Sequence, residues 1–152
     1  MRMLNKWVAA AMLAILANTA FAADKPPAEQ AVELVHKVID YMKANGKEKT
    51  IAEVNSVNGQ FRKGELYVTI NDMQANTLAH GANPKMQGKN LIDLRDPDGK
   101  YFMRERLELA KKQKSGWQDY KFVNPVDGKM ERKAMYFERF DDLIVNCGIY
   151  KN

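Results

Sequence analysis

The clearest candidate for binding chemistry is Lys133, which lies in an apolar and aromatic run near the C-terminal end of the chain. If the preceding turn has an even number of residues, the period of two places Tyr120 and Phe122 on the same sheet face as Lys133. A buried lysine needs a partner, and no acid in its run other than Glu131 is an obvious one. The carboxylate of a ligand would supply one; in the alternative, the side chain extends its ammonium group to solvent.

His80 is the second candidate, because it ends an alternating run and is followed directly by Gly81. A side chain at such a position can line a cleft, and an imidazole can donate a hydrogen bond to a ligand oxygen. His36 lies at the edge of a helical stripe and is interpreted as a surface or packing residue.

The remaining residues argue against catalysis. The chain has one cysteine and two histidines, which excludes an intramolecular disulfide and a cysteine-only zinc site. Cys147 lies in the middle of an apolar run, where a thiol usually fills a core. No nucleophile elbow, metalloprotease motif, calcium loop or phosphate-binding loop occurs, and Asp96 begins a turn sequence rather than a calcium site. We therefore expect a binding protein with no cofactor, no metal and no enzymatic activity.

The spacing of apolar residues predicts the elements that position these candidates. A long helix is expected between Asp24 and Asn45, and a capping box at Thr50 and Glu53 is expected to begin a short second helix. A further amphipathic helix follows Phe102. Five alternating runs predict strands, at 66–70, 77–80, 117–123, 131–138 and 143–150. Short turns imply antiparallel pairing, so we expect an α+β fold with a five-stranded antiparallel sheet and helices collected on one side.

The first 22 residues have the three-part pattern of a secretory signal peptide, with Arg2 and Lys6 before an apolar run and small residues at 18–22. An uncleaved anchor is the alternative. Cleavage would leave 130 residues, enough for one domain, with a net charge of +3. This charge is too weak to indicate nucleic-acid binding. We expect a periplasmic protein with no membrane span after signal cleavage.

From Gly64 to Tyr150 the chain resembles the single Cache domains of the second type, which are extracellular sensor modules of bacterial chemoreceptors and histidine kinases. The order and spacing of several short pieces carry this resemblance; they lie at 64–68, 78–81, 88–91, 96–102, 116–120, 124–125, 133–136 and 148–150. The chain departs from the family at His80-Gly81, where many members have His-Pro. It is most similar to the free-standing, secreted versions of the family.

The resemblance implies a PAS-like fold whose sheet and overlying loop enclose one pocket for a short organic acid. Together with the signal-peptide pattern, it divides the chain into a signal peptide (1–22), an N-terminal helical segment (23–63) and the ligand-binding domain (64–150). The pocket positions that it implies are His80, Tyr120 and Lys133, with walls from Tyr67, Phe102 and Trp117.

These observations together predict a periplasmic domain that binds a small carboxylate and has no signalling output of its own, with a membrane-bound receptor or kinase as a candidate partner. The alternative is a partner-docking or self-assembling subunit with no small-molecule ligand. Such a protein should expose a contiguous apolar patch, for which the Val32–Ile39 side of the first helix is the candidate.

Overall fold

The computed structural model describes residues 25–151, so the predicted signal peptide at 1–22 lies outside the described residues. The predicted helices and strands are all present, and a two-residue strand and a short 3-10 helix are added. In chain order the elements are α1 (Pro27–Asn45), α2 (Lys47–Asn55), β1 (Arg62–Lys63), β2 (Leu66–Asp72), β3 (Thr77–His80), η1 (Pro84–Met86), α3 (Phe102–Lys112), β4 (Ser115–Val123), β5 (Met130–Phe140) and β6 (Leu143–Lys151).

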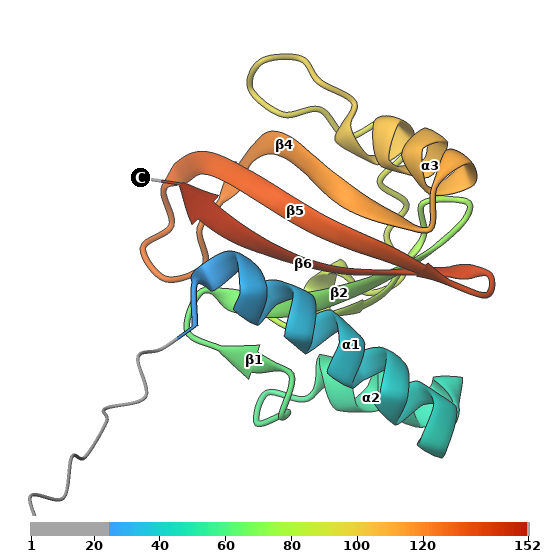
Figure 1. The fold of residues 1–152 in the computed structure, drawn as a ribbon. Helices are drawn as coiled ribbons and strands as arrows, with labels where there is room; N and C mark the ends of the chain where they lie inside the picture. The colour runs from blue at the N-terminus through green and yellow to red at the C-terminus, as the bar shows by residue number, and fades with distance from the viewer. Residues whose placement is uncertain (1–24, 152) are drawn as a thin grey trace, which may run out of the picture.

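The strands form one antiparallel sheet in the order β1-β2-β6-β5-β4, with β3 also paired to β2 (Figure 1). The last strand of the chain therefore lies in the middle of the sheet, between β2 and β5. Hairpins join β4 to β5 and β5 to β6, as short connections require. The expected α+β, PAS-like architecture, with a long N-terminal helix on a mostly antiparallel sheet, is confirmed.

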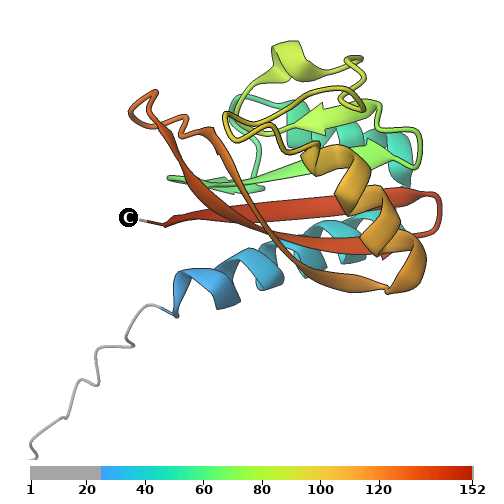
Figure 2. The ribbon, with the colours of Figure 1, turned by 90° about the horizontal axis from the view of Figure 1, so that it is seen from above.

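The helices cover both faces of the sheet, and the expectation that they collect on one side is wrong. Val145 and Cys147 of β6 belong to the core beneath α1, whereas Ile144 of the same strand belongs to the core beneath α3. Successive residues of a strand point to opposite faces, so these two cores lie on opposite sides of the sheet. Figure 2 shows α3 and the segment before it lying over the sheet on the side away from α1.

The apolar stripe of α1 packs against the sheet. Val35, Val38 and Ile39 are buried there, and Val32 is half-buried. The Val32–Ile39 side is therefore not the exposed patch that partner docking through this helix would need. Within residues 25–151, no helix combines the length and apolar content that crossing a membrane requires.

The second helix begins earlier than the capping-box pattern predicts. Gly46 has a φ of 87°, which ends α1 and lets α2 begin at Lys47. Thr50 consequently lies inside α2, where its hydroxyl donates to the carbonyl of Gly46 at 2.8 Å. The predicted role of Thr50 as the first capping residue is wrong, because the positive-φ glycine already supplies the break between the helices.

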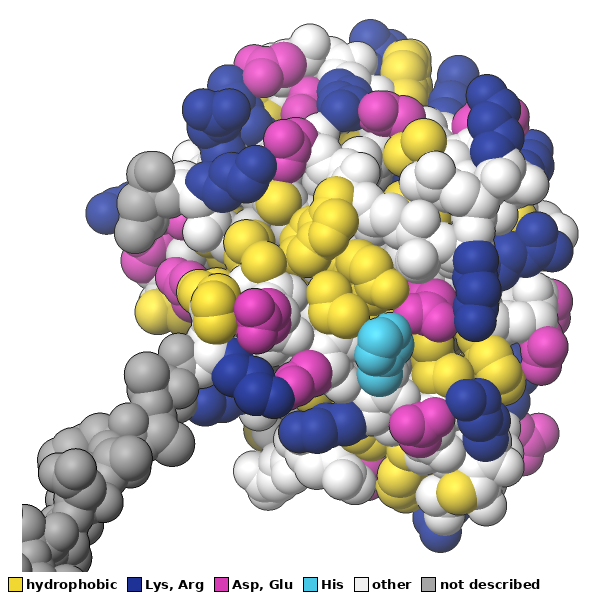
Figure 3. Space-filling model, viewed as in Figure 1, with side chains coloured by type: hydrophobic (Ala, Val, Ile, Leu, Met, Phe, Trp, Pro, Cys, Tyr) yellow, Lys and Arg dark blue, Asp and Glu magenta, His cyan; other side chains and the backbone are white. Residues whose placement is uncertain are grey.

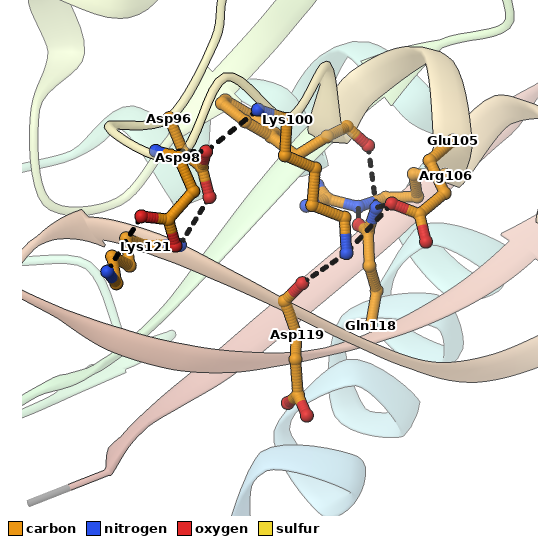
Figure 4. A network of polar contacts seen from close by, with 9 residues as sticks. Asp96, Asp98, Lys100, Glu105, Arg106, Gln118, Asp119 and Lys121 are labelled. Carbon is orange, nitrogen blue, oxygen red and sulfur yellow. Dashed lines mark hydrogen bonds and ion pairs between the residues drawn. The ribbon is translucent and has the colours of Figure 1, made fainter.

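The segment between η1 and α3 is fastened to the sheet by Asp96. One carboxylate oxygen of Asp96 accepts hydrogen bonds from the backbone N–H groups of Asp98 and Lys100, at 3.0 and 2.9 Å. The other accepts from the backbone N–H of Lys121 on β4 at 3.1 Å. Figure 4 shows this attachment beside the polar contacts of α3. The predicted turn at Asp96 therefore also holds the chain that covers one face of the sheet.

Candidate functional site

A cavity lies between the sheet and the segment from η1 to α3. Its enclosed volume is small, about 20 Å³, and the wider space around it, about 360 Å³, includes open solvent. Its lining combines aromatic and thioether side chains with a few polar groups: Tyr67, Thr69, Asn71, Thr77, His80, Met86, Leu91, Phe102, Met103, Arg106, Tyr120, Phe122 and Met135. A largely apolar cavity with a small number of polar groups is typical of small-molecule sites. We call it the inner cavity.

The inner cavity brings together Tyr67, His80, Phe102 and Tyr120 from the expected pocket residues. The rings of Phe102 and Tyr120 stack with centroids 4.5 Å apart, and those of Tyr67 and His80 stack at 5.0 Å. β2, β3 and β4 supply three of these residues, and α3 supplies Phe102. Backbone pairing within the sheet therefore fixes most of the wall.

Lys133 lies directly opposite Tyr120 in the β4–β5 ladder, on the face that the alternation predicts. Its side chain is 1% exposed, so the alternative in which it reaches solvent does not fit. The Nζ atom donates hydrogen bonds to the hydroxyls of Tyr67 (2.6 Å) and Tyr150 (3.1 Å), and it does not itself line the inner cavity. Because both partners are hydroxyls, burial dominates and lowers the pKa of Lys133 to about 7.

His80 is held as a neutral hydrogen-bond donor. Its Nδ1 atom accepts the backbone N–H of Asn83 at 3.0 Å, so the hydrogen of the neutral ring is on Nε2. Burial, and then the positive charge of Lys133, lower the pKa of His80 to about 4. The imidazole is therefore uncharged near neutral pH and retains one N–H for a ligand.

Trp117 is the expected wall residue that the structure places elsewhere. It lies three positions before Tyr120 on β4, so its side chain projects from the opposite face of the sheet. There it packs on Tyr136, with ring centroids 5.4 Å apart, and it is 41% exposed. Figure 3 shows apolar side chains gathered near the middle of the face of the molecule that carries α1. Trp117 is thus separated from the inner cavity by the sheet.

The residue that sequence reasoning missed is Arg106 of α3. It is 2% exposed and lines the inner cavity, with its guanidinium carbon 5.3 Å from the ring centroid of Tyr120. Its Nε atom donates to Gln118 at 3.0 Å and its Nη1 atom to Asn146 at 3.5 Å. Its Nη2 atom is buried and has no hydrogen-bond partner among the described residues. A signal was present, because Arg106 falls within the apolar stripe formed by Phe102, Met103, Leu107 and Ala110.

A network of buried amides keeps the Arg106 guanidinium in place. Gln118 donates to the carbonyl of Phe102 at 2.8 Å and to Glu105 at 3.0 Å, which orients its oxygen toward Arg106 (Figure 4). Asn146 is fully buried in β6 and donates to Asn71 at 3.1 Å, so its oxygen is also directed by its neighbours. The result is a fixed cation beside the cavity whose Nη2 amino group is unused, which suits an anionic acceptor.

Comparisons with known proteins agree with this fold. The family model described as dCache_2, a Cache domain, matches residues 25–150 and so includes both the N-terminal helices and the sheet. The subtype in this match differs from the single Cache domain of the second type expected from the sequence. The chain is 33% identical over 86 residues to the methyl-accepting chemotaxis protein McpP of Pseudomonas putida, an alignment covering 55% of this chain and 16% of that protein. The alignment thus spans about a sixth of that relative.

Three solved structures share the fold. One is the periplasmic sensor domain of a chemotaxis protein, with a TM-score of 0.69, 20% identity and coverage of 82% of this chain and 97% of that chain. Another is a Cache chemosensory domain solved to explain carboxylic acid recognition, with a TM-score of 0.68, 21% identity and coverage of 82% and 93%. The third is a methyl-accepting chemotaxis protein of Vibrio parahaemolyticus, with a TM-score of 0.70, 19% identity and coverage of 81% and 87%.

Proposed function

The chain belongs to the Cache family of sensor domains, and from this membership we propose that it binds a short organic acid in the inner cavity. Cache domains are non-enzymatic sensors, and this confirms the expectation that the protein is not an enzyme. The finer assignments proposed with it are a periplasmic location, a membrane-bound receptor or kinase as partner, and the single Cache subtype of the second type.

The observation that carries the carboxylate assignment is the unused Nη2 of Arg106. A buried guanidinium without a counter-ion is costly, because the protein has removed it from water and supplied no negative charge in return. A carboxylate oxygen in the inner cavity would accept from Nη2 in a charge-assisted hydrogen bond. An amine ligand would instead place a second cation beside Arg106.

The neighbouring groups support the same ligand. The hydroxyl of Tyr120 and the Nε2–H of His80 are donors in the cavity lining, and a carboxylate can accept from both. Lys133 lies behind Tyr67, to which it donates a hydrogen bond. A carboxylate bound in the cavity would favour the charged ammonium form of Lys133 over its neutral amine form. Phe102 and Met135 supply apolar walls that suit a short carbon tail.

The alternative of partner docking through α1 has no supporting observation, because the Val32–Ile39 side of that helix packs on the sheet. One solved Cache domain with the same fold recognises carboxylic acids, which is consistent with the proposal. At 21% identity, that similarity shows a shared fold only.

A thermal unfolding screen tests the proposal. Acetate, propionate, butyrate, lactate and pyruvate are compared with the amides acetamide and propionamide, which keep the shape and lose the charge. An acid at about 100 times its dissociation constant should raise the free energy of unfolding by about 2.7 kcal/mol, and its amide should not. Stabilisation by amines or purines but by no acid, or equal stabilisation by acid and amide, would contradict the assignment.

A further inference from the structure

A second pocket adjoins the inner cavity and is larger and more open. Its free space is about 860 Å³, part of which is solvent, and we call it the outer pocket. Its lining is Tyr67, His80, Ala82, Asn83, Met86, Phe122, Val123, Asn124, Pro125 and Gly128. Tyr67, His80, Met86 and Phe122 line both spaces. The two spaces therefore meet at these four side chains.

Three of the four shared side chains are held rigidly by the sheet. Tyr67 on β2 accepts a hydrogen bond from Lys133, and His80 on β3 accepts one from the backbone N–H of Asn83. The ring centroid of Phe122 on β4 lies 5.9 Å from those of Phe102 and Tyr120. Met86 differs because it belongs to the 3-10 helix η1 in the covering loop and is half-buried. A methionine side chain has three rotatable bonds and adapts to what it contacts. Met86 is thus the adjustable part of the boundary.

The outer pocket suits an uncharged group better than a second carboxylate. Apart from the shared residues, its lining has no ionisable side chain and includes Ala82, Val123 and Pro125. The side-chain amide of Asn124 donates to Glu65 at 2.8 Å and to Glu131 at 2.9 Å, so two carboxylates lie beside the pocket wall. A second negative charge on the ligand would be repelled there.

We propose that Met86 sets the length of the ligand tail, by closing the passage from the inner cavity to the outer pocket against Phe122. This inference rests on the proposed function, because it places the carboxylate at Arg106 and the tail toward Met86. The preferred ligand is then an unbranched monocarboxylate whose last carbon contacts the Met86 side chain. Shortening Met86 opens the passage for longer acids, and enlarging it excludes them.

Calorimetric titration of the protein with acetate, propionate, butyrate, valerate and hexanoate tests this role. Met86→Ala should move the tightest-bound acid toward longer chains, with about a fourfold gain in affinity for each methylene newly covered, which corresponds to about 0.8 kcal/mol. Met86→Phe should move it toward shorter chains. Met130→Ala is the matched control, since Met130 is 50% exposed and lines neither space.

The outcomes separate the two proposals. A shift of the preferred length in opposite directions for the two Met86 variants, with Met130→Ala like the wild type, supports the inference. The same preferred acid in the wild type and both variants overturns it while leaving the carboxylate site standing. Failure of every acid to bind the wild type refutes the proposed function itself. Tighter binding of succinate than of butyrate also overturns the inference, because the outer pocket would then hold a charge.

Discussion

Replacing Arg106 with methionine should separate ligand binding from folding. The substitution removes a guanidinium that is 2% exposed and has no counter-ion within residues 25–151, and methionine fills a similar length of apolar space. Relief of the desolvation penalty stabilises the fold, typically by about 1–4 kcal/mol for buried ionic groups replaced by apolar ones. The losses opposing it are the hydrogen bond to Gln118 and the longer one to Asn146, whose oxygens would lose their donor at a combined cost of about 1–3 kcal/mol. The free energy of unfolding should therefore lie between about 2 kcal/mol below and about 3 kcal/mol above that of the wild type.

The affinity for the acid should fall steeply in the same variant. Removing the donor of a charge-assisted hydrogen bond costs about 2–4 kcal/mol, which is roughly a 30- to 1000-fold weaker dissociation constant. Arg104→Met is the control, because Arg104 lies on the same helix, is half-exposed and pairs with Asp93 away from the inner cavity. It should leave the affinity unchanged.

Urea denaturation gives the stability, and calorimetry with the best acid from the screen gives the affinity. The reasoning is refuted if Arg106→Met binds the acid within threefold of the wild type. It is equally refuted if the variant loses several kcal/mol of stability in the absence of ligand, since Arg106 would then be a structural residue.

Three further substitutions test the surroundings of the site. The pKa of Lys133 is about 7 in the folded protein, against an ordinary value of 10.5. Between these two pH values the unfolded chain keeps the Lys133 proton and the folded protein does not. The free energy of unfolding should therefore rise from pH 7 to 10.5 by up to about 5 kcal/mol. Lys133→Met should abolish this pH dependence of the free energy of unfolding, measured by denaturation at several pH values. An unchanged pH dependence would contradict the assignment to Lys133. Gly148→Ala places a Cβ 2.3 Å from Lys133 Cε and should lower the free energy of unfolding by about 1–3 kcal/mol. In a double-mutant cycle, Lys133→Ala should relieve this loss. Asp96→Ala removes the acceptor for three backbone N–H groups and should cost about 1–3 kcal/mol in thermal unfolding, whereas the exposed Asp119→Ala should cost little.

The sequence was sufficient for the features that depend on local periodicity. Alternation of apolar residues located the strands, and short turns required antiparallel pairing. The shared face of Lys133 and Tyr120 followed from the period of two, given an even turn, and the structure adds that the two residues are directly paired. The same alternation also excludes Trp117 from the cavity face, because it lies an odd number of residues from Tyr120. The expectation that Trp117 is a pocket wall came from the family resemblance, whereas the alternation along the strand places its side chain on the other face.

Tertiary structure alone decided the features that depend on long-range contacts. The position of β6 between β2 and β5 brings Asn146 beside Asn71, a pairing that no local pattern specifies. The placement of α3 on the face opposite α1 turns Arg106 toward the inner cavity, where its charge is buried and the described part of the chain supplies no counter-ion. An amphipathic stripe records that a helix has a buried side, but it does not record which face of the sheet the helix covers. The identity of the buried cation beside the cavity therefore emerges only when the two sheet faces are assigned.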